Sequence, residues 1–146
     1  MEKKLSDKNS IEEDNLLPKR KIPYAWLALA YAILILIVSS IPDLSPPQLG
    51  FEYQDKLYHF IEYAVFSVFL FFALLNSSKD FLRKNVLLIS LLIGASFGIL
   101  DELHQKFIPG RQADVLDFTA DFVGVALIQL CFWVYHRRKS KIHSNA

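Results

Sequence analysis

The sequence predicts an all-α membrane protein, a bundle of four transmembrane helices with both chain ends in the cytoplasm. Three observations lead to this prediction. Hydrophobic residues make up 53% of the 146 residues, more than a soluble chain of this length can bury in one core. They are concentrated in long runs separated by short polar segments. Lys and Arg gather in the segments that would lie on one side of a membrane.

The first apolar run extends from Tyr24 to Ile41, and we expect a helix over residues 24–41. Residues 1–21 before it are polar and mixed in charge, which is typical of a disordered tail. A signal peptide is the alternative, because the run ends in small serine residues. However, the run is longer than the usual signal-peptide apolar region of about 7–15 residues, and acidic residues precede it. The sequence therefore favours a retained helix.

Polar segments separate the remaining helices. Residues 42–54 contain three prolines, which remove backbone donors that lipid cannot replace, so we expect a loop outside the hydrocarbon. Helices are predicted over residues 57–75, 86–105 and 115–136, with a short polar turn at 76–84. Residues 22–136 would form one membrane domain, and residues 137–146 would form a basic cytoplasmic tail.

Basic residues set the expected orientation. Lys and Arg are frequent before the first run, in the 76–84 turn and after the last run. The opposite side carries only Lys56, Lys106 and Arg111. Because cytoplasmic loops are enriched in Lys and Arg, both ends and the 76–84 turn are expected in the cytoplasm, and the proline-containing loops outside.

Composition also excludes several functions. The net charge of +1 argues against a nucleic-acid binder that works by neutralising phosphates. The single cysteine, Cys131, excludes an intrachain disulfide and a multi-cysteine metal site. The sequence has no glycine-rich phosphate loop, nucleophilic serine elbow or two-histidine zinc motif. No cofactor is therefore evident from motifs.

Ionisable residues lie at a similar depth in three of the predicted helices. Counted from the cytoplasmic ends at about 1.5 Å per residue, Glu62, Asp101 and Asp121 lie roughly 21–24 Å deep. This is the outer third of a hydrocarbon core about 30 Å thick. Helical spacing places three sets of residues each on one face: Asp55, His59 and Glu62; Asp101 and Gln105; Asp117, Asp121 and Gly124. We therefore expect the polar faces to converge near the outer surface.

Acids outnumber fixed cations in this cluster. The acids are Asp55, Glu62, Asp101, Glu102, Asp114, Asp117 and Asp121, and the cations are Lys56, Lys106 and Arg111. Complete pairing is impossible if every acid is ionised, so some acids must be protonated, hydrated at the rim or bound to a cation. A divalent cation is therefore a cofactor that the sequence leaves open.

The residue types suggest roles. The candidate catalytic residues are His59, Asp101, Glu102 and Asp117, which can exchange protons or bind a cation. The candidate substrate-binding residues are Lys56, Gln105 and Arg111, because a guanidinium can hold a phosphate or carboxylate through two hydrogen bonds. Asp55, Glu62, Tyr63 and Asp121 would complete the polar network. The alternative is a purely structural network in which the basic residues pair with the acids.

At these residues the sequence resembles the VanZ-like family of small bacterial multi-pass membrane proteins. The matching elements are Asp55-Lys56-x-x-His59-Phe60-x-x-Tyr63, Asp101-Glu102-x-x-Gln105-x-Phe107-x-Pro109-Gly110-Arg111 and Asp117-x-x-x-Asp121-x-x-Gly124. Asp121 stands where many members of the family have Asn. The resemblance implies a bacterial cytoplasmic membrane protein. The family's namesake is linked to teicoplanin resistance, so a role in glycopeptide antibiotic resistance is one expectation.

These observations lead to one preferred hypothesis and two alternatives. The preferred function is an outward-facing polar site that handles a membrane lipid headgroup or a cell-wall precursor. One alternative is a membrane enzyme acting on a phospholipid or polyprenyl-linked substrate, and the other is a non-catalytic partner in envelope assembly. The sequence leaves all three open, together with a homo-oligomeric state.

Overall fold

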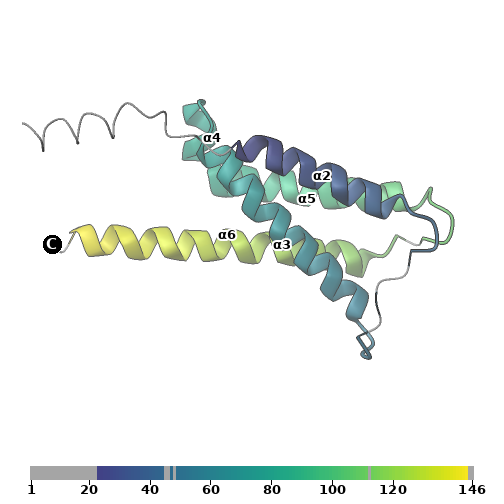
Figure 1. Ribbon diagram of the computed structural model, residues 1–146. Helices are drawn as coiled ribbons and strands as arrows, with labels where there is room; N and C mark the ends of the chain where they lie inside the picture. Colours follow the sequence, from purple (N-terminus) through teal and green to yellow (C-terminus); the bar gives the residue numbers. More distant parts are fainter. Residues whose placement is uncertain (1–22, 45–46, 48, 112, 145–146) are drawn as a thin grey trace, which may run out of the picture.

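The computed structural model describes residues 23–44, 47, 49–111 and 113–144, with side chains as far as Arg138. Over these residues the regular structure is entirely helical: α2 (Tyr24–Ser39), α3 (Gln54–Leu75), α4 (Asp80–Lys84), α5 (Val86–Gln105) and α6 (Val115–Ser144) (Figure 1). The predicted N-terminal tail lies outside the described residues. The prediction of an all-α fold is confirmed for the described residues.

Three helices in the described part of the chain are long and apolar enough to cross a membrane. They are α3, α5 and the Val115–Arg138 part of α6. α2 is also apolar, but its 16 residues extend only about 24 Å. Large apolar side chains cover the outside of the bundle, including Ile33, Leu92 and Leu130. A soluble protein would bury such side chains, whereas a lipid environment accommodates them.

Two helix boundaries differ from the prediction on the side of the proline-containing loops. α2 ends at Ser39 rather than at residue 41, because the residue before Pro42 is disfavoured in a helix. α3 begins at Gln54 rather than at residue 57. The acidic Asp55 therefore lies in the first turn of α3, where a carboxylate interacts favourably with the helix dipole.

The other end of the bundle also contains more helix than predicted. The 76–84 segment, for which the sequence predicts a polar turn, includes the short helix α4. α6 continues to Ser144, so the backbone of residues 137–144 is helical although this segment was predicted to be a tail. Arg137 lies over the ring of Trp133, 4.3 Å from its centroid, as a basic residue at a membrane interface can.

α3 is the central helix of the bundle and packs against α2, α5 and α6 (Figure 1). Its buried side chains Tyr63, Phe66 and Phe71 form a core with Ile35 of α2 and Val125 of α6. Gly124 of α6 lets the helices approach closely, because a Cβ there would collide with the backbone carbonyl of Phe60. The close α3–α6 contact brings the polar faces of these helices together.

The loops at one end of the bundle contact each other. We call this the loop end; it comprises the described residues of 40–53 and 106–114. The backbone N–H of Asp43 donates to the carbonyl of Pro109 at 3.3 Å. Gly110 has a φ of +75°, and a Cβ there would overlap the Asp43 carboxylate. Ser40 and His104 form a hydrogen bond of 2.8 Å. These contacts fix the loop that carries Arg111.

Candidate functional site

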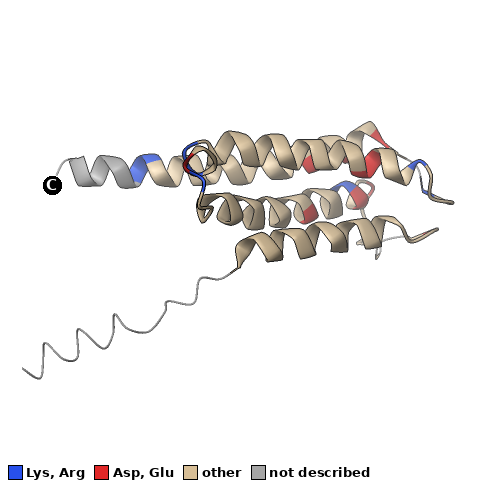
Figure 2. Ribbon diagram, turned by 90° about the horizontal axis from the view of Figure 1, so that it is seen from above, with Lys and Arg blue, Asp and Glu red and all other residues tan. Residues whose placement is uncertain are grey.

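The acidic residues of α3, α5 and α6 lie toward the loop end of the bundle. In the ribbon of Figure 2 they lie opposite the C-terminal end, where the basic residues of α4 and α6 are found together with the acidic Asp80 of α4. All the side chains selected from the sequence as site candidates lie on α3, α5, α6 or the connecting 106–114 loop. Three linked groups of contacts make up the site.

The first group surrounds Lys56 of α3. Its Nζ atom lies 3.0 Å from Asp55, 2.7 Å from Asp114 and 2.7 Å from Asp117. The hydrogen bond from Lys56 is the main cause that lowers the pKa of Asp114, which lies just outside the membrane-spanning part of α6. Lys56 therefore joins the start of α3 to the start of α6, and its ammonium makes ion pairs with three carboxylates.

The second group joins His59 of α3 to α6. The Nδ1 atom of His59 lies 3.0 Å from Oδ1 of Asp121, and its Nε2 atom lies 3.9 Å from Oδ1 of Asp117. Asp121 is only 1% exposed. Its other oxygen faces α5 at Gly98, where an added Cβ would lie 3.3 Å away. A glycine at this position leaves room for the carboxylate between the two helices.

The third group leads from the loop to α5. Arg111 Nη2 donates to Gln105 Oε1 at 2.9 Å, and Gln105 Nε2 donates to Asp101 Oδ2 at 3.0 Å. Arg111 Nη1 also donates to the carbonyl of Leu44 at 3.3 Å. Among the described residues, Arg111 makes no ion pair with a carboxylate. Its charge is therefore held in place by neutral acceptors.

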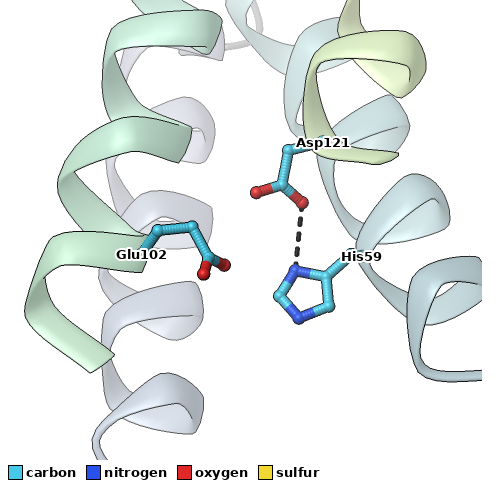
Figure 3. A group of neighbouring side chains, drawn as sticks. All are labelled: His59, Glu102 and Asp121. Atoms are coloured by element: carbon cyan, nitrogen blue, oxygen red, sulfur yellow. Dashed lines mark hydrogen bonds and ion pairs between the residues drawn. The ribbon is translucent and has the colours of Figure 1, made fainter. Parts of the chain in front are cut away.

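Glu102 of α5 lies between these groups. Its Oε2 atom accepts a hydrogen bond from the backbone N–H of Asp114 at 3.0 Å. Figure 3 shows its carboxylate directed toward the space bordered by His59 and Asp121. One ligand atom from each of His59, Glu102 and Asp121 can be chosen so that all three lie within 4.8 Å of one another.

Several buried polar atoms of the site lack a hydrogen-bond partner among the described residues. Leaving aside Asp117 Oδ1, which makes an ion pair with Lys56, they are Tyr63 Oη, Asp101 Oδ1, Glu102 Oε1 and Asp121 Oδ2. Most buried polar atoms in proteins are paired, and each exception needs an explanation. Three of these atoms are carboxylate oxygens, so the natural partners would be donors or a cation. The arrangement thus has the capacity to bind a ligand.

A cavity of about 580 Å³ opens beside these groups, between α2, α3 and the loop end. Its polar lining residues are Asp55, Tyr58, His59, Glu62, Gln105, Arg111 and Asp117, and its apolar ones are Val38, Leu44, Pro47 and Ile61. This volume lies within the range of ligand sites, about 300–1,000 Å³. A smaller cavity of about 280 Å³ between α5 and α6 reaches Glu102 from the other side.

The structure brings most of the predicted site residues into direct contact. Glu62 lines the cavity without an ion-pair partner among the described residues, and Tyr63 packs in the core. The catalytic and substrate-binding roles assigned from the sequence remain predictions.

Sequence reasoning missed Gly98 and the deeper pair in which Gln129 donates to Ser67 at 2.7 Å. Gly98 lies four residues after Gly94, and this small-residue spacing was a usable signal. Gln129 lies eight residues after Asp121, on the same side of α6 as the polar face that was recognised. Extending both polar stripes inward would have identified these positions.

Comparison with known proteins identifies a protein family and a relative. The sequence model of a protein family described as VanZ/LLP1 matches residues 3–136. A protein of the fission yeast Schizosaccharomyces pombe, named Uncharacterized protein C11E3.10, is 29% identical over 111 residues. That alignment covers 76% of this chain but only 65% of the yeast protein, slightly less than two thirds of its length. No solved structure matches the chain.

Proposed function

This chain belongs to the VanZ/LLP1 family, and we propose that it binds an anionic lipid headgroup in the cavity at the loop end. The observation that carries the proposal is the set of contacts that Arg111 makes. This residue lines the cavity, and its contacts within the described chain are to the neutral oxygens of Gln105 and Leu44. A guanidinium has five N–H donors, so several remain for a phosphate.

Lys56 is a weaker candidate for the same contact. It was selected with Arg111 as a substrate-binding residue, but its ammonium already lies within 3.0 Å of three carboxylates. An anionic ligand would have to compete with them for the ammonium. We therefore assign the headgroup contact to Arg111 and Gln105, and we assign Lys56 a role in joining α3 to α6.

The apolar lining of the cavity suits the rest of a lipid molecule. Val38 of α2 and Ile61 of α3 line it together with the polar groups. Ile61 is also 49% exposed on the outside of the bundle. A ligand whose phosphate contacts Arg111 can therefore extend its apolar part along α2 and α3 toward the membrane.

The proposed topology has four spans, with both termini and α4 in the cytoplasm and the loop end outside. The basic residues Arg83, Lys84, Arg137 and Arg138 support this orientation, because they lie at the end opposite the site. α2 is shorter than a hydrocarbon core of about 30 Å, so it would cross by local thinning of the bilayer. A cytoplasmic membrane is the proposed location.

The relative from fission yeast favours a lipid headgroup over a bacterial cell-wall precursor. Anionic phospholipids are ligands that both bacterial and yeast membranes offer. A polyprenyl-linked wall precursor carries the same phosphate chemistry, and it is the ligand expected if the chain acts in glycopeptide resistance. The experiment below separates the two ligands.

A second function, hydrolysis or group transfer on such a lipid, is favoured by one observation. His59 lines the cavity and is held by the buried carboxylate of Asp121 at 3.0 Å. A histidine oriented by a carboxylate is the arrangement of a general base. Under this proposal, Asp121→Asn would abolish turnover of a bound phospholipid while leaving its binding in place.

A thermal-shift titration in mild detergent tests the proposed binding. The probes are short-chain phosphatidylglycerol, polyprenyl phosphate and the zwitterionic phosphatidylcholine, on the wild type, Arg111→Ala and Arg83→Ala. Arg83 is a matched control because it is an exposed arginine in α4 that pairs with Asp80. A charge-assisted hydrogen bond contributes about 1.5–3 kcal/mol, so Arg111→Ala should weaken binding about 10- to 100-fold.

The outcomes of this titration are distinct. The wild type and Arg83→Ala should both be stabilised by the anionic lipids, and Arg111→Ala should not. Stabilisation by polyprenyl phosphate alone would identify a wall-precursor ligand instead of a phospholipid. Equal stabilisation of all three proteins by phosphatidylglycerol would show that Arg111 does not bind the headgroup.

A further inference from the structure

We propose that His59, Glu102 and Asp121 form a binding site for one divalent transition-metal ion, such as Zn²⁺ or Mn²⁺ (Figure 3). We call these residues the His–Glu–Asp cluster. The proposal goes beyond headgroup binding, and it does not depend on it, because Arg111 belongs to a different group of contacts.

The three ligands come from three helices that the fold holds side by side. His59 lies on α3, Glu102 on α5 and Asp121 on α6. Their ligand atoms lie within 4.8 Å of one another. Two ligands of one tetrahedral ion with bonds of about 2.2 Å are separated by about 3.6 Å. Side-chain movements of up to about 1 Å would therefore bring the three ligand atoms to these separations.

Two carboxylate oxygens of the cluster are buried and available for a metal. Asp121 is 1% exposed and Glu102 is 7% exposed. Asp121 Oδ2 and Glu102 Oε1 have no hydrogen-bond partner among the described residues. Figure 3 shows both carboxylates and the imidazole bordering one common space. Each carboxylate has a donor on its other oxygen only, and leaving the second buried oxygen unpaired is costly. A bound cation would remove that cost.

The charges around the cluster also favour a bound cation. Lys56 already contacts three other carboxylates, and Arg111 contacts neutral acceptors. Within the described chain, the basic group in contact with Asp121 is His59. A divalent ion would balance both carboxylates of the cluster and would replace the proton that joins His59 to Asp121.

The ligand types select the class of metal. One imidazole with two carboxylates suits Zn²⁺ and Mn²⁺, whereas Ca²⁺ and Mg²⁺ prefer oxygen ligands alone. Three protein ligands leave a coordination position for a further oxygen ligand. Because His59 also lines the 580 Å³ cavity, that oxygen can come from a molecule in the cavity.

Neighbouring groups hold the proposed ligands in place, as the groups around the ligands of known metal sites do. The backbone N–H of Asp114 holds Glu102 Oε2 at 3.0 Å, which leaves Oε1 as the free oxygen. Gly98 gives Asp121 the space to lie between α5 and α6. Hydrogen bonds and packing of this kind orient metal ligands and raise their affinity.

Metal binding is tested by equilibrium dialysis and metal analysis on chelator-treated protein in detergent, with Zn²⁺, Mn²⁺, Mg²⁺ and Ca²⁺. The wild type should retain one equivalent of Zn²⁺ or Mn²⁺ and should prefer them to Mg²⁺ and Ca²⁺. His59→Gln, Glu102→Gln and Asp121→Asn should each bind at least 10-fold more weakly, on the order of the effect of altering a metal site. Asp80→Asn, an exposed acid in α4, is the control and should bind like the wild type.

A spectroscopic measurement on the wild type covers the case in which a variant fails to fold. Cu²⁺ bound at the cluster should show, by electron spin echo modulation, coupling to the remote nitrogen of one imidazole. Absence of stoichiometric binding by the folded wild type, or bound Cu²⁺ without a histidine signal, would overturn the proposal. Arg111→Ala should keep the metal, so loss of headgroup binding and loss of metal binding are separable.

Discussion

The Nδ1 atom of His59 lies 3.0 Å from Oδ1 of Asp121, although the two residues are 62 positions apart in the sequence. This contact joins α3 to α6 near the loop end. It depends on the close packing of the two helices at Gly124, one turn further into the bundle. The site therefore depends on this packing, on the loops and on the charges around the two residues.

Gly124→Ala should destabilise the bundle. The added Cβ would collide with the carbonyl of Phe60, which is backbone and cannot rotate away. Overpacking of this kind costs about 1–3 kcal/mol, so we expect a lower melting temperature in detergent and weaker metal binding by His59 and Asp121. Ser96→Ala, at an exposed position of α5, is the control. A melting temperature equal to that of the control would contradict close α3–α6 packing.

Gly110→Ala should weaken headgroup binding by displacing the loop that carries Arg111. Its φ of +75° is unfavourable for alanine, and the new Cβ would overlap the Asp43 carboxylate. Gly50→Ala separates these effects, because Gly50 has a φ of +83° but open space around it. Both variants should lose about 1–2 kcal/mol of stability from backbone strain. Only Gly110→Ala should bind phosphatidylglycerol more weakly. Equal binding by both variants would show that the position of this loop does not affect headgroup binding.

Lys56→Met should be destabilising. It leaves three carboxylates, those of Asp55, Asp114 and Asp117, without their shared cation. The side chains of Asp55 and Asp114 are 49% and 42% exposed, and that of Asp117 is 10% exposed, so the loss should come mainly from Asp117. Leaving one such buried acceptor unpaired costs about 1–3 kcal/mol. Thermal unfolding in detergent measures the effect. A variant as stable as the wild type would mean that water or a bound cation already balances these acids.

The Lys56–Asp114 contact should make stability depend on acid pH. Lys56 lowers the pKa of Asp114 in the folded protein. A lowered folded pKa contributes stability above the unfolded value, about 3.9, and this contribution is lost as pH falls through the folded pKa. Between pH 6 and pH 3, the melting temperature should therefore decrease less steeply for Asp114→Asn than for the wild type. Parallel curves would rule out this contribution.

Gln129→Leu should leave the site intact. Gln129 donates to Ser67 deep in the bundle, and among the described residues it makes no hydrogen bond to the loop-end groups. Hydrogen bonds inside membranes contribute on average only about 0.6 kcal/mol, and leucine fills a similar volume. We expect a melting temperature within a few degrees of the wild type and unchanged binding of lipid and metal. Loss of binding would indicate that the polar network extends along the whole bundle.

The sequence predicted the helices and their polar faces because both depend on local patterns. Apolar runs identify the long helices, and the spacing of Asp117 and Asp121 identifies a polar face without any tertiary information. The start of α3 was predicted too late because Asp55 and Lys56 are polar, although a helix tolerates an acid in its first turn.

The contacts that each charged side chain makes could not be predicted, because they depend on distances between helices. Periodicity shows that Lys56 and Arg111 lie near acids, but not that Lys56 contacts three of them while Arg111 contacts neutral oxygens. The bridge from Arg111 through Gln105 to Asp101 likewise depends on the course of the loop. These differences in partner decide which residue is assigned the headgroup contact.

The most direct test of headgroup binding at the loop end is native mass spectrometry of the protein released from lipid bilayers. Wild type and Arg111→Ala would be prepared in parallel from bilayers that contain phosphatidylglycerol and phosphatidylcholine in equal amounts. We predict that the wild type retains one phosphatidylglycerol molecule and that Arg111→Ala retains none while keeping its helical content. Equal retention by both proteins, or no preference for the anionic lipid, would contradict the proposed function.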